Sequence, residues 1–324
     1  MKRRNVLAIL GSVPLAVSFG APTRAQDAYP AKPVKILVPF GPGGSTDIIS
    51  RLVGKQLETV TGKPFVVENK PGATGMIGTT QVKNAAADGH TLLLGSTSTL
   101  AANPSLYKQM TYDPSDFTTV AVNGSVGNFM LVNKDGPYRT VKEFVAFAKA
   151  SKEPLFSGYG NASSRVPSAL FEVTSGVKFE EVAYRDAVAS IQDLAAGRVH
   201  AVFPDQVVGE SYVRSGFVRA LAVTSAERSA LFPDVEAIAE TYPGYNIIAF
   251  SCFSVRKETP AEIKQRLNRL IMEALYEPTV LERVKQLGFL PPPSDWDIAK
   301  CDAFVVRERE DWTRYIKLAK IEPQ

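Results

Sequence analysis

The sequence predicts an α/β protein of two domains, and three observations support this. Apolar runs of strand length alternate with amphipathic helical segments, which is typical of β-α-β units in parallel sheets. About 300 residues follow an N-terminal export segment, and a single hydrophobic core usually stops growing near this size. The chain also ends in a run of helices after a second set of strands, which indicates that it returns to the first domain.

Residues 1–25 have the layout of a secretory signal peptide. A basic stretch at 2–4 precedes an apolar stretch at 6–21, and small residues stand before an expected cleavage near Ala25. The two arginines of the basic stretch also fit a twin-arginine signal loosely, so both export routes stay open. We therefore expect the mature chain to be exported.

Composition argues against several classes of function. The chain has 37 Lys and Arg against 33 Asp and Glu, but four of the basic residues lie in the first 26 residues, which hold no acid. The exported part is therefore balanced, and it lacks the basic surplus that nucleic-acid binding requires. Beyond the export segment no apolar run reaches the ~18 residues of a membrane span.

Histidine and cysteine are too few and too scattered for most metal or catalytic sites. The two histidines and two cysteines show no ligand spacing, so we expect no metal, no cofactor and no catalytic residue. His200 lies within a strand pattern and is expected to be structural. Cys252 and Cys301 could form a disulfide after export, but two separate buried thiols are the favoured alternative.

The first part of the mature chain predicts three strands separated by helices. Strands are expected at residues 34–40, 65–67 and 91–95, with helices at 47–57 and from residue 79. In the helix at 47–57 the apolar residues recur at helical spacing and form one face. This order of elements predicts a parallel sheet.

A second series of strands and helices begins near residue 129. Strands are expected at 129–132, 155–157, 182–184, 200–203 and 218–223. Helices are expected after Thr140, whose spacing to Glu143 is that of a capping box, at 161–176 and at 187–196, which Gly197 ends. A second sheet is therefore predicted.

The end of the chain is predicted to rejoin the first domain. A long apolar strand starts near Tyr245, and three helices follow it to residue 320. We expect two crossings between the lobes, near 122–127 and near 244–249. The predicted limits are 26–124 with 248–324 for the first lobe and 125–247 for the second.

A glycine-rich turn, PFGPGGSTD at residues 39–47, follows the first strand. It lacks the third glycine of a dinucleotide fingerprint, the Gly-Lys-Ser/Thr of a P-loop and the G-x-S-x-G of a nucleophile elbow. It does place a helix N-terminus at the end of a strand, where backbone N–H groups favour an anion. Gly43 and Gly44 allow close approach, and Asp47 is expected to hold the loop rather than the anion. A plain tight turn remains the alternative for this loop alone.

Turns rich in small and hydroxyl residues also follow three other predicted strands. ENKPGATGMIG at 68–78, GSTST at 95–99 and GYGNASSR at 158–165 are rich in Gly, Ser and Thr. Four such turns predict a cleft lined by backbone amides and hydroxyls. Charge-assisted hydrogen bonds of this kind suit a carboxylate.

These motifs, in this order, resemble the Bug family, the periplasmic solute-binding proteins of tripartite tricarboxylate transporters. The resemblance rests on YPAKPVKILVPFGPGGSTD, VVENKPGATGMIG, DGHTLLLGSTST, ANPSLY and VRALAVTSAERSALFPDV, and it spans essentially the whole mature chain. It implies a type II Venus-flytrap fold in the periplasm, with each lobe a mixed, mainly parallel sheet flanked by helices. It also implies a monomer that binds a small carboxylate, aliphatic or aromatic, and delivers it to inner-membrane transporter subunits.

The resemblance implies that two loops of the first lobe grip the ligand carboxylate like pincers. The ligand-binding residues expected in this lobe are Phe40, Pro42, Gly43, Gly44, Ser45, Thr46, Asp47, Thr74, Gly75, Met76, Thr97 and Ser98. Those expected in the second lobe are Asn161, Ser163, Ser164, Arg165, Tyr184, Arg185 and Asp205. The second lobe departs from the usual family pattern around several of these residues, so its specificity is expected to differ.

The two arginines bear on the identity of the ligand. If Arg165 or Arg185 faces the cleft, its guanidinium could bind a second carboxylate, which favours a dicarboxylate. Each could instead form an ion pair, Arg185 with Asp186 for example. Tyr184 is expected to pack on the ligand and to hydrogen-bond it, whereas Met76 could contact either the ligand or the core.

Two other functions stay open. A binding protein of this kind could pass its liganded state to a membrane histidine kinase, because a sensor needs the same closing cleft. A periplasmic enzyme acting on a carboxylate is the weaker alternative, since the sequence shows no catalytic motif. In both binding hypotheses the ligand bridges the two lobes and so favours the closed state.

Overall fold

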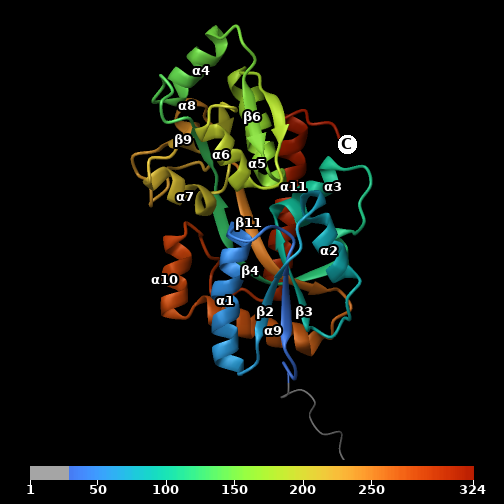
Figure 1. The fold of residues 1–324 in the computed structure, drawn as a ribbon. Helices are drawn as coiled ribbons and strands as arrows, with labels where there is room; N and C mark the ends of the chain where they lie inside the picture. The colour runs from blue at the N-terminus through green and yellow to red at the C-terminus, as the bar shows by residue number, and fades with distance from the viewer. Residues whose placement is uncertain (1–28) are drawn as a thin grey trace, which may run out of the picture.

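The computed structural model describes residues 29–324, which form two lobes, and the predicted signal peptide lies outside them (Figure 1). The lobe at the bottom of Figure 1 holds a five-stranded sheet in the order β2-β1-β3-β11-β4. Its strands are β1 (Val34–Val38), β2 (Phe65–Asn69), β3 (Thr91–Ser96), β4 (Phe117–Gly127) and β11 (Ile248–Arg256). We call this lobe 1.

The lobe at the top, lobe 2, holds a six-stranded sheet in the order β10-β9-β5-β8-β6-β7 (Figure 1). Its strands are β5 (Phe129–Val132), β6 (Phe156–Tyr159), β7 (Glu180–Ala183), β8 (Ala201–Val202), β9 (Arg219–Val223) and β10 (Glu236–Ala237). Every strand predicted for this part of the chain is present, and β10 is an addition.

In each sheet one strand runs against the others. β11 is antiparallel to both β3 and β4, and β5 is antiparallel to both β8 and β9, whereas the remaining pairs are parallel. β5 and β11 are the strands that the chain enters after each passage between the sheets. The predicted mixed, mainly parallel sheets are confirmed, and the carboxyl ends of β1, β2 and β3 face those of β6, β7 and β8 across the cleft.

Helices pack on both sheets. Those of lobe 1 are α1 (Ser45–Thr61), α2 (Met76–Lys83), α3 (Asn103–Leu106), α9 (Ala261–Leu275), α10 (Pro278–Gln286) and α11 (Ile298–Leu318). Those of lobe 2 are α4 (Val141–Ala150), α5 (Ala162–Ser175), α6 (Ala187–Ala195), α7 (Gln206–Arg214) and α8 (Ile238–Thr241). The sequence did not predict the π-helical turn at Thr97–Ala102, which leads from β3 into α3.

The first helix shows why the local sequence was informative. Ile49, Val53 and Leu57 recur every four residues and are fully buried, so one face of α1 packs on the sheet. The helix ends at Gly62, whose φ of 68° lies in the left-handed region that favours glycine. It begins at Ser45, two residues before the predicted start, and this brings the glycine-rich turn directly to its N-terminus.

Thr224 of lobe 2 forms hydrogen bonds to both of the chain segments that connect the lobes. Its hydroxyl accepts a hydrogen bond from the Asn128 N–H at 2.9 Å and donates one to the Ile247 carbonyl at 2.7 Å. The Asn128 side chain in turn donates to the Phe203 and Ser163 carbonyls. The two connecting segments are therefore fastened to one point at the base of lobe 2.

The last helix, α11, packs against both lobes (Figure 1). It contacts β4 and the Thr97–Ala102 turn of lobe 1 and α5 of lobe 2, with Trp312 fully buried. Cys301 of α11 and Cys252 of β11 are buried free thiols, and burial raises the pKa of Cys252 to about 12 and that of Cys301 to about 11. The structure thus shows two separate buried thiols, which is the alternative favoured from the sequence.

Candidate functional site

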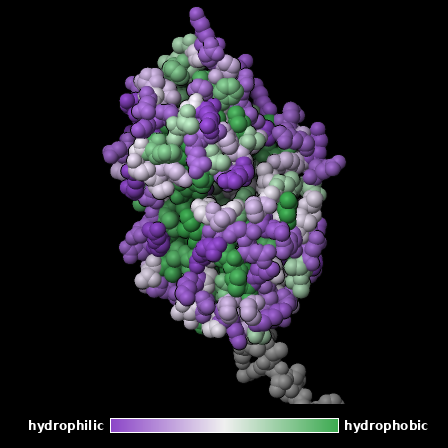
Figure 2. Space-filling view, in the orientation of Figure 1, coloured by the Kyte–Doolittle hydropathy of each residue, from purple (hydrophilic) through white to green (hydrophobic). Residues whose placement is uncertain are grey.

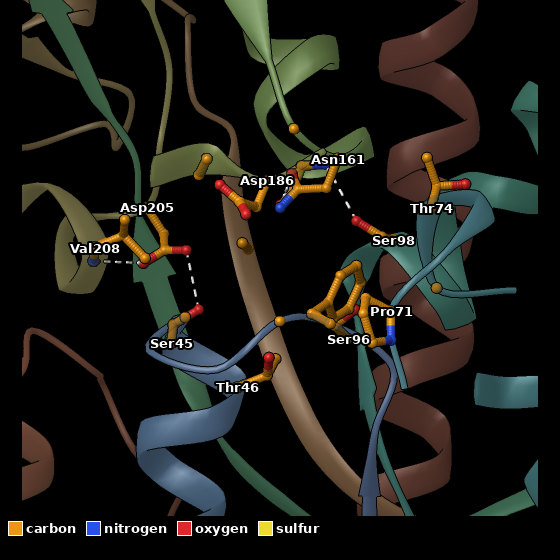
Figure 3. Close-up of a pocket in the computed structure, with 18 of the residues that line it drawn as sticks. Ser45, Thr46, Pro71, Thr74, Ser96, Ser98, Asn161, Asp186, Asp205 and Val208 are labelled. Carbon is orange, nitrogen blue, oxygen red and sulfur yellow. Dashed lines mark hydrogen bonds between the residues drawn. The ribbon is translucent and has the colours of Figure 1, made fainter. Parts of the chain in front are cut away.

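A cavity of about 390 Å³ lies between the facing strand ends of the two lobes. Figure 2 shows a hollow at the level where the lobes meet, and Figure 3 shows side chains of both lobes around it. Lobe 1 contributes the turns after β1, β2 and β3, and lobe 2 contributes those after β6, β7 and β8. Ligands of open α/β sheets bind at such strand ends.

The turn before α1 leaves the helix N-terminus without a side-chain cap. The N-cap residue is Gly44, and no side chain bonds to the first turn from this position. The Asp47 carboxylate turns back instead and accepts hydrogen bonds from the Gly43 N–H, Arg51 and Asn69, each at 3.0 Å. The first N–H groups of α1 and its positive dipole end thus remain available to an anion.

Asp47 holds the loop and is neutralised within lobe 1. Burial alone would raise the pKa of its carboxyl group, but the hydrogen bonds from Arg51, Gly43 and Asn69 outweigh burial and lower the pKa below the usual 3.8. Asp47 does not line the cavity. The carboxylate therefore shapes the turn without repelling an anion at the helix end.

The turn before α2 is strained. Four consecutive residues have positive φ, at 135° for Gly72, 46° for Ala73, 51° for Thr74 and 89° for Gly75. Left-handed backbone costs a residue with a side chain about 1–2 kcal/mol. Turns of this kind direct neighbouring N–H groups to one side and form concave anion sites, and such strain is concentrated at functional sites.

The two turns of lobe 1 pack on each other. A Cβ atom at Gly75 would lie 2.8 Å from Cγ2 of Thr99 and 3.1 Å from Cζ of Phe40. Position 75 therefore accepts only glycine without movement of its neighbours. Because Phe40 follows β1 and Gly75 follows β2, this contact fixes the two turns as one unit.

Two hydrogen bonds join the lobes on opposite sides of the cavity (Figure 3). The Ser45 hydroxyl at the start of α1 donates to Oδ2 of Asp205 at 2.9 Å. The N–H of Ser163, in α5, donates to Oγ of Ser98 at 3.3 Å. The lobes are therefore closed over the cavity.

Lobe 2 presents three helix N-termini, and its own side chains cap all of them. Asn161 caps α5 through the Ser164 N–H, Asp186 caps α6 at 2.8 Å, and Asp205 caps α7 at 3.1 Å. Burial raises the pKa of Asp205, although the Val208 N–H and the Ser45 hydroxyl partly oppose that shift. This wall therefore carries two acceptor-rich carboxyl groups where the wall of lobe 1 carries free donors.

Most of the predicted ligand-binding residues line the cavity. Those that do are Phe40, Pro42, Gly44, Ser45, Thr46, Thr74, Gly75, Thr97, Ser98, Asn161, Ser163, Tyr184, Arg185 and Asp205. Gly43, Asp47, Met76, Ser164 and Arg165 are absent from the lining. Met76 packs against the hydrophobic core, and the Ser164 hydroxyl bonds to the turn that precedes α5, so both side chains have structural roles.

Arg165 does not face the cavity, contrary to one of the two expectations for it. Its guanidinium bonds both carboxylate oxygens of Glu181 at 2.7–3.0 Å and lies 5.3 Å from the centre of the Tyr159 ring. The alternative expected from the sequence, an ion pair, describes it. Arg185 does line the cavity, but 86% of its side chain is exposed and its Nε lies 3.3 Å from Asp186.

Tyr184 offers its ring rather than its hydroxyl proton. The hydroxyl donates to Asp193 at 2.9 Å, and burial together with this carboxylate raises the pKa of Tyr184 to about 12. The expected hydrogen bond from Tyr184 to a ligand would therefore compete with Asp193. His200 accepts the Phe156 N–H through Nδ1 at 3.0 Å, in line with the structural role expected for it.

Sequence reasoning missed part of the lining. The missed apolar residues include Val126, Val188, Val208, Ala249, Phe250 and Phe289, and the missed polar ones include Ser96 and Asp186. The sequence could have indicated Asp186, because it stands directly before a predicted helix, in the position of an N-cap residue. No local pattern indicates Phe289, because it follows α10 and lies at the cavity only as a result of tertiary packing.

Comparison with known proteins identifies the family. The model of the tripartite tricarboxylate transporter family receptor matches residues 49–319. This chain belongs to that receptor family. The matched family consists of binding receptors rather than enzymes. Within residues 29–324, no cluster of His, Cys, Asp and Glu is placed to hold a metal ion, and no helix has the length and apolar character to cross a membrane.

Similar proteins and solved structures are consistent with this family assignment. Protein BugT of Bordetella pertussis is 32% identical over 98% of this chain and 98% of its own. The structure of R. palustris Rpa4515 with adipate has a TM-score of 0.88 at 30% identity, covering 91% of this chain and all of that one. MatC from Rhodopseudomonas palustris, solved with malate, has a TM-score of 0.83 at 28% identity, covering 89% and 100%. The two-lobe solute-binding fold predicted from the sequence is confirmed.

Proposed function

We propose that this receptor captures a small organic acid by closing its lobes around the acid's carboxylate, and that the closed form delivers it to a tripartite transporter in the inner membrane. One observation carries the proposal: two helix N-termini without side-chain caps, one of them on a strained left-handed turn, meet at the cavity between the lobes. An anion at this point accepts hydrogen bonds from the first N–H groups of α1, which no side chain of the protein caps.

The contacts divide between the lobes. In lobe 1, Gly44, Ser45 and Thr46 together with Thr74 and Gly75 bind the carboxylate. The apolar walls and the Tyr184 ring pack on the carbon skeleton, and lobe 2 contacts the far end. Because the ligand touches both lobes only when they are closed, its binding shifts the population toward the closed state. The moving bodies are residues 26–124 with 248–324, and residues 125–247.

The neighbours favour this proposal over a sensor or an enzyme. Adipate and malate occupy two proteins of the same fold, and both are small carboxylates. The ligand of the present protein is not fixed by these neighbours. The expectation of a dicarboxylate rested on Arg165 and Arg185, and only Arg185 lines the cavity.

The proposal is tested by calorimetry on the purified mature protein. A thermal-shift screen of mono-, di- and tricarboxylates, aliphatic and aromatic, first finds ligands, because binding raises the unfolding temperature. Gly44→Leu is then compared with the wild type. A Cβ atom at position 44 would have the Gly41 carbonyl oxygen, at 3.7 Å, as its nearest contact beyond the neighbouring residues, so the variant should fold and lose at least 100-fold in affinity. Unchanged affinity in Gly44→Leu would overturn the assignment of this turn.

Location and partner are tested separately. We propose cleavage near Ala25 and release to the periplasm as a monomer. Mass spectrometry of the periplasmic fraction should give a mature N-terminus at residue 26. Co-purification of the liganded protein, but not of Gly44→Leu, with membrane transporter subunits would support delivery to a transporter, and capture of a histidine kinase instead would favour the sensor alternative.

A further inference from the structure

The lobe-2 wall of the cavity differs in charge from the wall that holds the carboxylate. The charged residues that line the cavity are Arg185, Asp186 and Asp205, and all three belong to lobe 2. The two carboxyl groups cap the N-termini of α6 and α7. The positive ends of both helices are therefore already met by acids of the protein itself, and a second ligand carboxylate would find no uncapped helix end there.

The two arginines that could bind a second carboxylate, Arg165 and Arg185, both lie beside acidic residues of the protein. Arg165 forms a two-pronged pair with Glu181 outside the cavity, with only 11% of its side chain exposed. Arg185 lies at the cavity rim with 86% of its side chain in solvent, and its nearest carboxylate is that of Asp186. Asp186 pairs with Arg185, and Asp205 adds a carboxyl group whose pKa is raised by burial, so the lining of this wall holds more acidic groups than basic ones.

Asp186 retains hydrogen-bonding capacity toward the cavity. One of its oxygens accepts the Ala189 N–H at 2.8 Å, and the other lies 3.3 Å from the exposed Arg185 side chain. A carboxylate can accept about four hydrogen bonds, so acceptor sites remain free. Figure 3 shows Asp186 above the cavity beside Asn161, opposite the lobe-1 residues Thr46 and Ser96.

We infer that the ligand is a carboxylate whose far end carries a protonated amine, and that Asp186 selects it. This inference rests on the proposed function, since it assumes that lobe 1 holds the carboxylate end. In the closed protein the ammonium group donates to Asp186, and Asp205 adds a second carboxyl group to the same wall. The apolar side chains Val188, Val208 and Phe250 enclose the carbon chain between the two charged ends.

The test compares ligands that differ only at the far end. Unbranched acids of four to six carbons are titrated by calorimetry in three forms: the ω-amino acid, the diacid and the plain monocarboxylic acid. The ω-amino acid of the best-fitting length should bind at least tenfold tighter than either of the other two. Tighter binding of the diacid at every length would overturn the inference.

Asp186→Asn supplies the decisive variant, because asparagine caps a helix as well as aspartate and so preserves α6. It should weaken the ω-amino acid at least tenfold and leave the monocarboxylic acid within twofold. Asp297→Asn is the matched control, since Asp297 likewise caps a helix, α11, but lies outside the cavity lining. It should change neither affinity.

The remaining outcomes separate this inference from the proposed function. If none of the acids in the carboxylate screen binds, both fall together. If the diacid binds best and Arg185→Gln abolishes that preference, the proposed function stands. Arg185 rather than Asp186 then binds the group at the far end of the ligand. Equal affinities of Asp186→Asn and the wild type for the ω-amino acid would also overturn the role of Asp186.

Discussion

Asp47 and Asp205 lie at the N-terminal ends of helices on opposite sides of the cleft, and their carboxyl groups have different partners and opposite pKa shifts. Asp47 turns back onto Arg51, Asn69 and the Gly43 N–H, and its pKa is lowered. Asp205 caps its own helix, contacts Ser45 across the cleft, and its pKa is raised by burial. The Asp47 carboxylate thus leaves the N-terminus of α1 uncapped, whereas the Asp205 carboxyl group caps the N-terminus of α7.

This difference extends to the whole of each wall. In lobe 1 glycines stand at the N-caps of α1 and α2, and no side chain caps either helix. The first N–H groups of α1 are thus free for a ligand, whereas those of Gly75, Met76 and Ile77 bond to carbonyls of their own turn. In lobe 2 the helix ends carry polar or acidic caps, so acceptors face the cavity. Two lobes with similar sheets can therefore recognise opposite ends of one molecule, because the cap residue decides the sign of what a helix end binds.

The largest expected effect comes from Asp47→Ala, which removes the group that shapes the lobe-1 turn. Asp47 is 4% exposed, and its loss leaves Arg51 and Asn69 without their partner. We expect about 2–3 kcal/mol lower stability and roughly 100-fold weaker carboxylate binding. Urea unfolding and calorimetry measure the two effects.

Glu181→Ala is the matched control on the lobe-2 side, because it also removes the carboxylate partner of an arginine. Its pair with Arg165 lies outside the cavity lining. It should lower stability without changing affinity by more than twofold. Equal losses of affinity in both variants would show that the two lobes do not differ in the way described.

A smaller effect is expected from relaxing the strained turn. Ala73→Gly removes a left-handed alanine, with a φ of 46°, and should raise stability by up to about 1 kcal/mol. The turn then loses part of its pre-organisation, so we expect affinity to fall about threefold to tenfold. A rise in both stability and affinity would argue that the strain serves no purpose in binding.

Smaller still are the two hydrogen bonds between the lobes. Ser45→Ala and Ser98→Ala each remove one of them, and a typical hydrogen bond contributes about 0.5–1.5 kcal/mol. We expect two- to tenfold weaker binding, seen by surface plasmon resonance as faster dissociation with little change in association. Unchanged dissociation rates in both variants would mean that these bonds do not hold the closed state.

The smallest effect is a pH dependence of opposite sign in the two lobes. The ionised form of Asp47 stabilises the fold above its usual pKa of 3.8, and this contribution is lost as the pH falls through the lowered value. The folded state holds the proton of Asp205 more tightly than the unfolded chain does, so its contribution falls as the pH rises from 3.8 upward.

Urea unfolding of the wild type, Asp47→Asn and Asp205→Asn between pH 3 and 7 measures these contributions. The stability advantage of the wild type over Asp47→Asn should grow with pH. Its advantage over Asp205→Asn should shrink over the same interval. Slopes of the same sign for the two variants would contradict the contrast between the carboxyl groups.

Local sequence was enough to predict the two glycine-rich turns of lobe 1 that line the cavity. In the turns at 39–47 and 68–78 the glycines Gly43, Gly72 and Gly75 have positive φ, and those requirements are local, although Ala73 and Thr74 adopt positive φ without being glycine. The sequence also indicated that Asp47 holds its loop, as its bonds with Gly43 and Arg51 now show. Each of these contacts spans only four residues, so the chain itself keeps the partners close.

The far wall depended on contacts that local sequence does not encode. Arg165 and Arg185 looked equivalent in the sequence, yet packing of α5 turns Arg165 onto Glu181 of the neighbouring strand, while Arg185 stays in solvent. Phe289 reaches the cavity from a segment that follows α10. The sequence by itself thus predicted the two lobes and their sheets, and it placed a glycine-rich turn at the start of α1. Only the tertiary structure decided which charges face the ligand, because helix rotation and strand order select the partner of each long side chain.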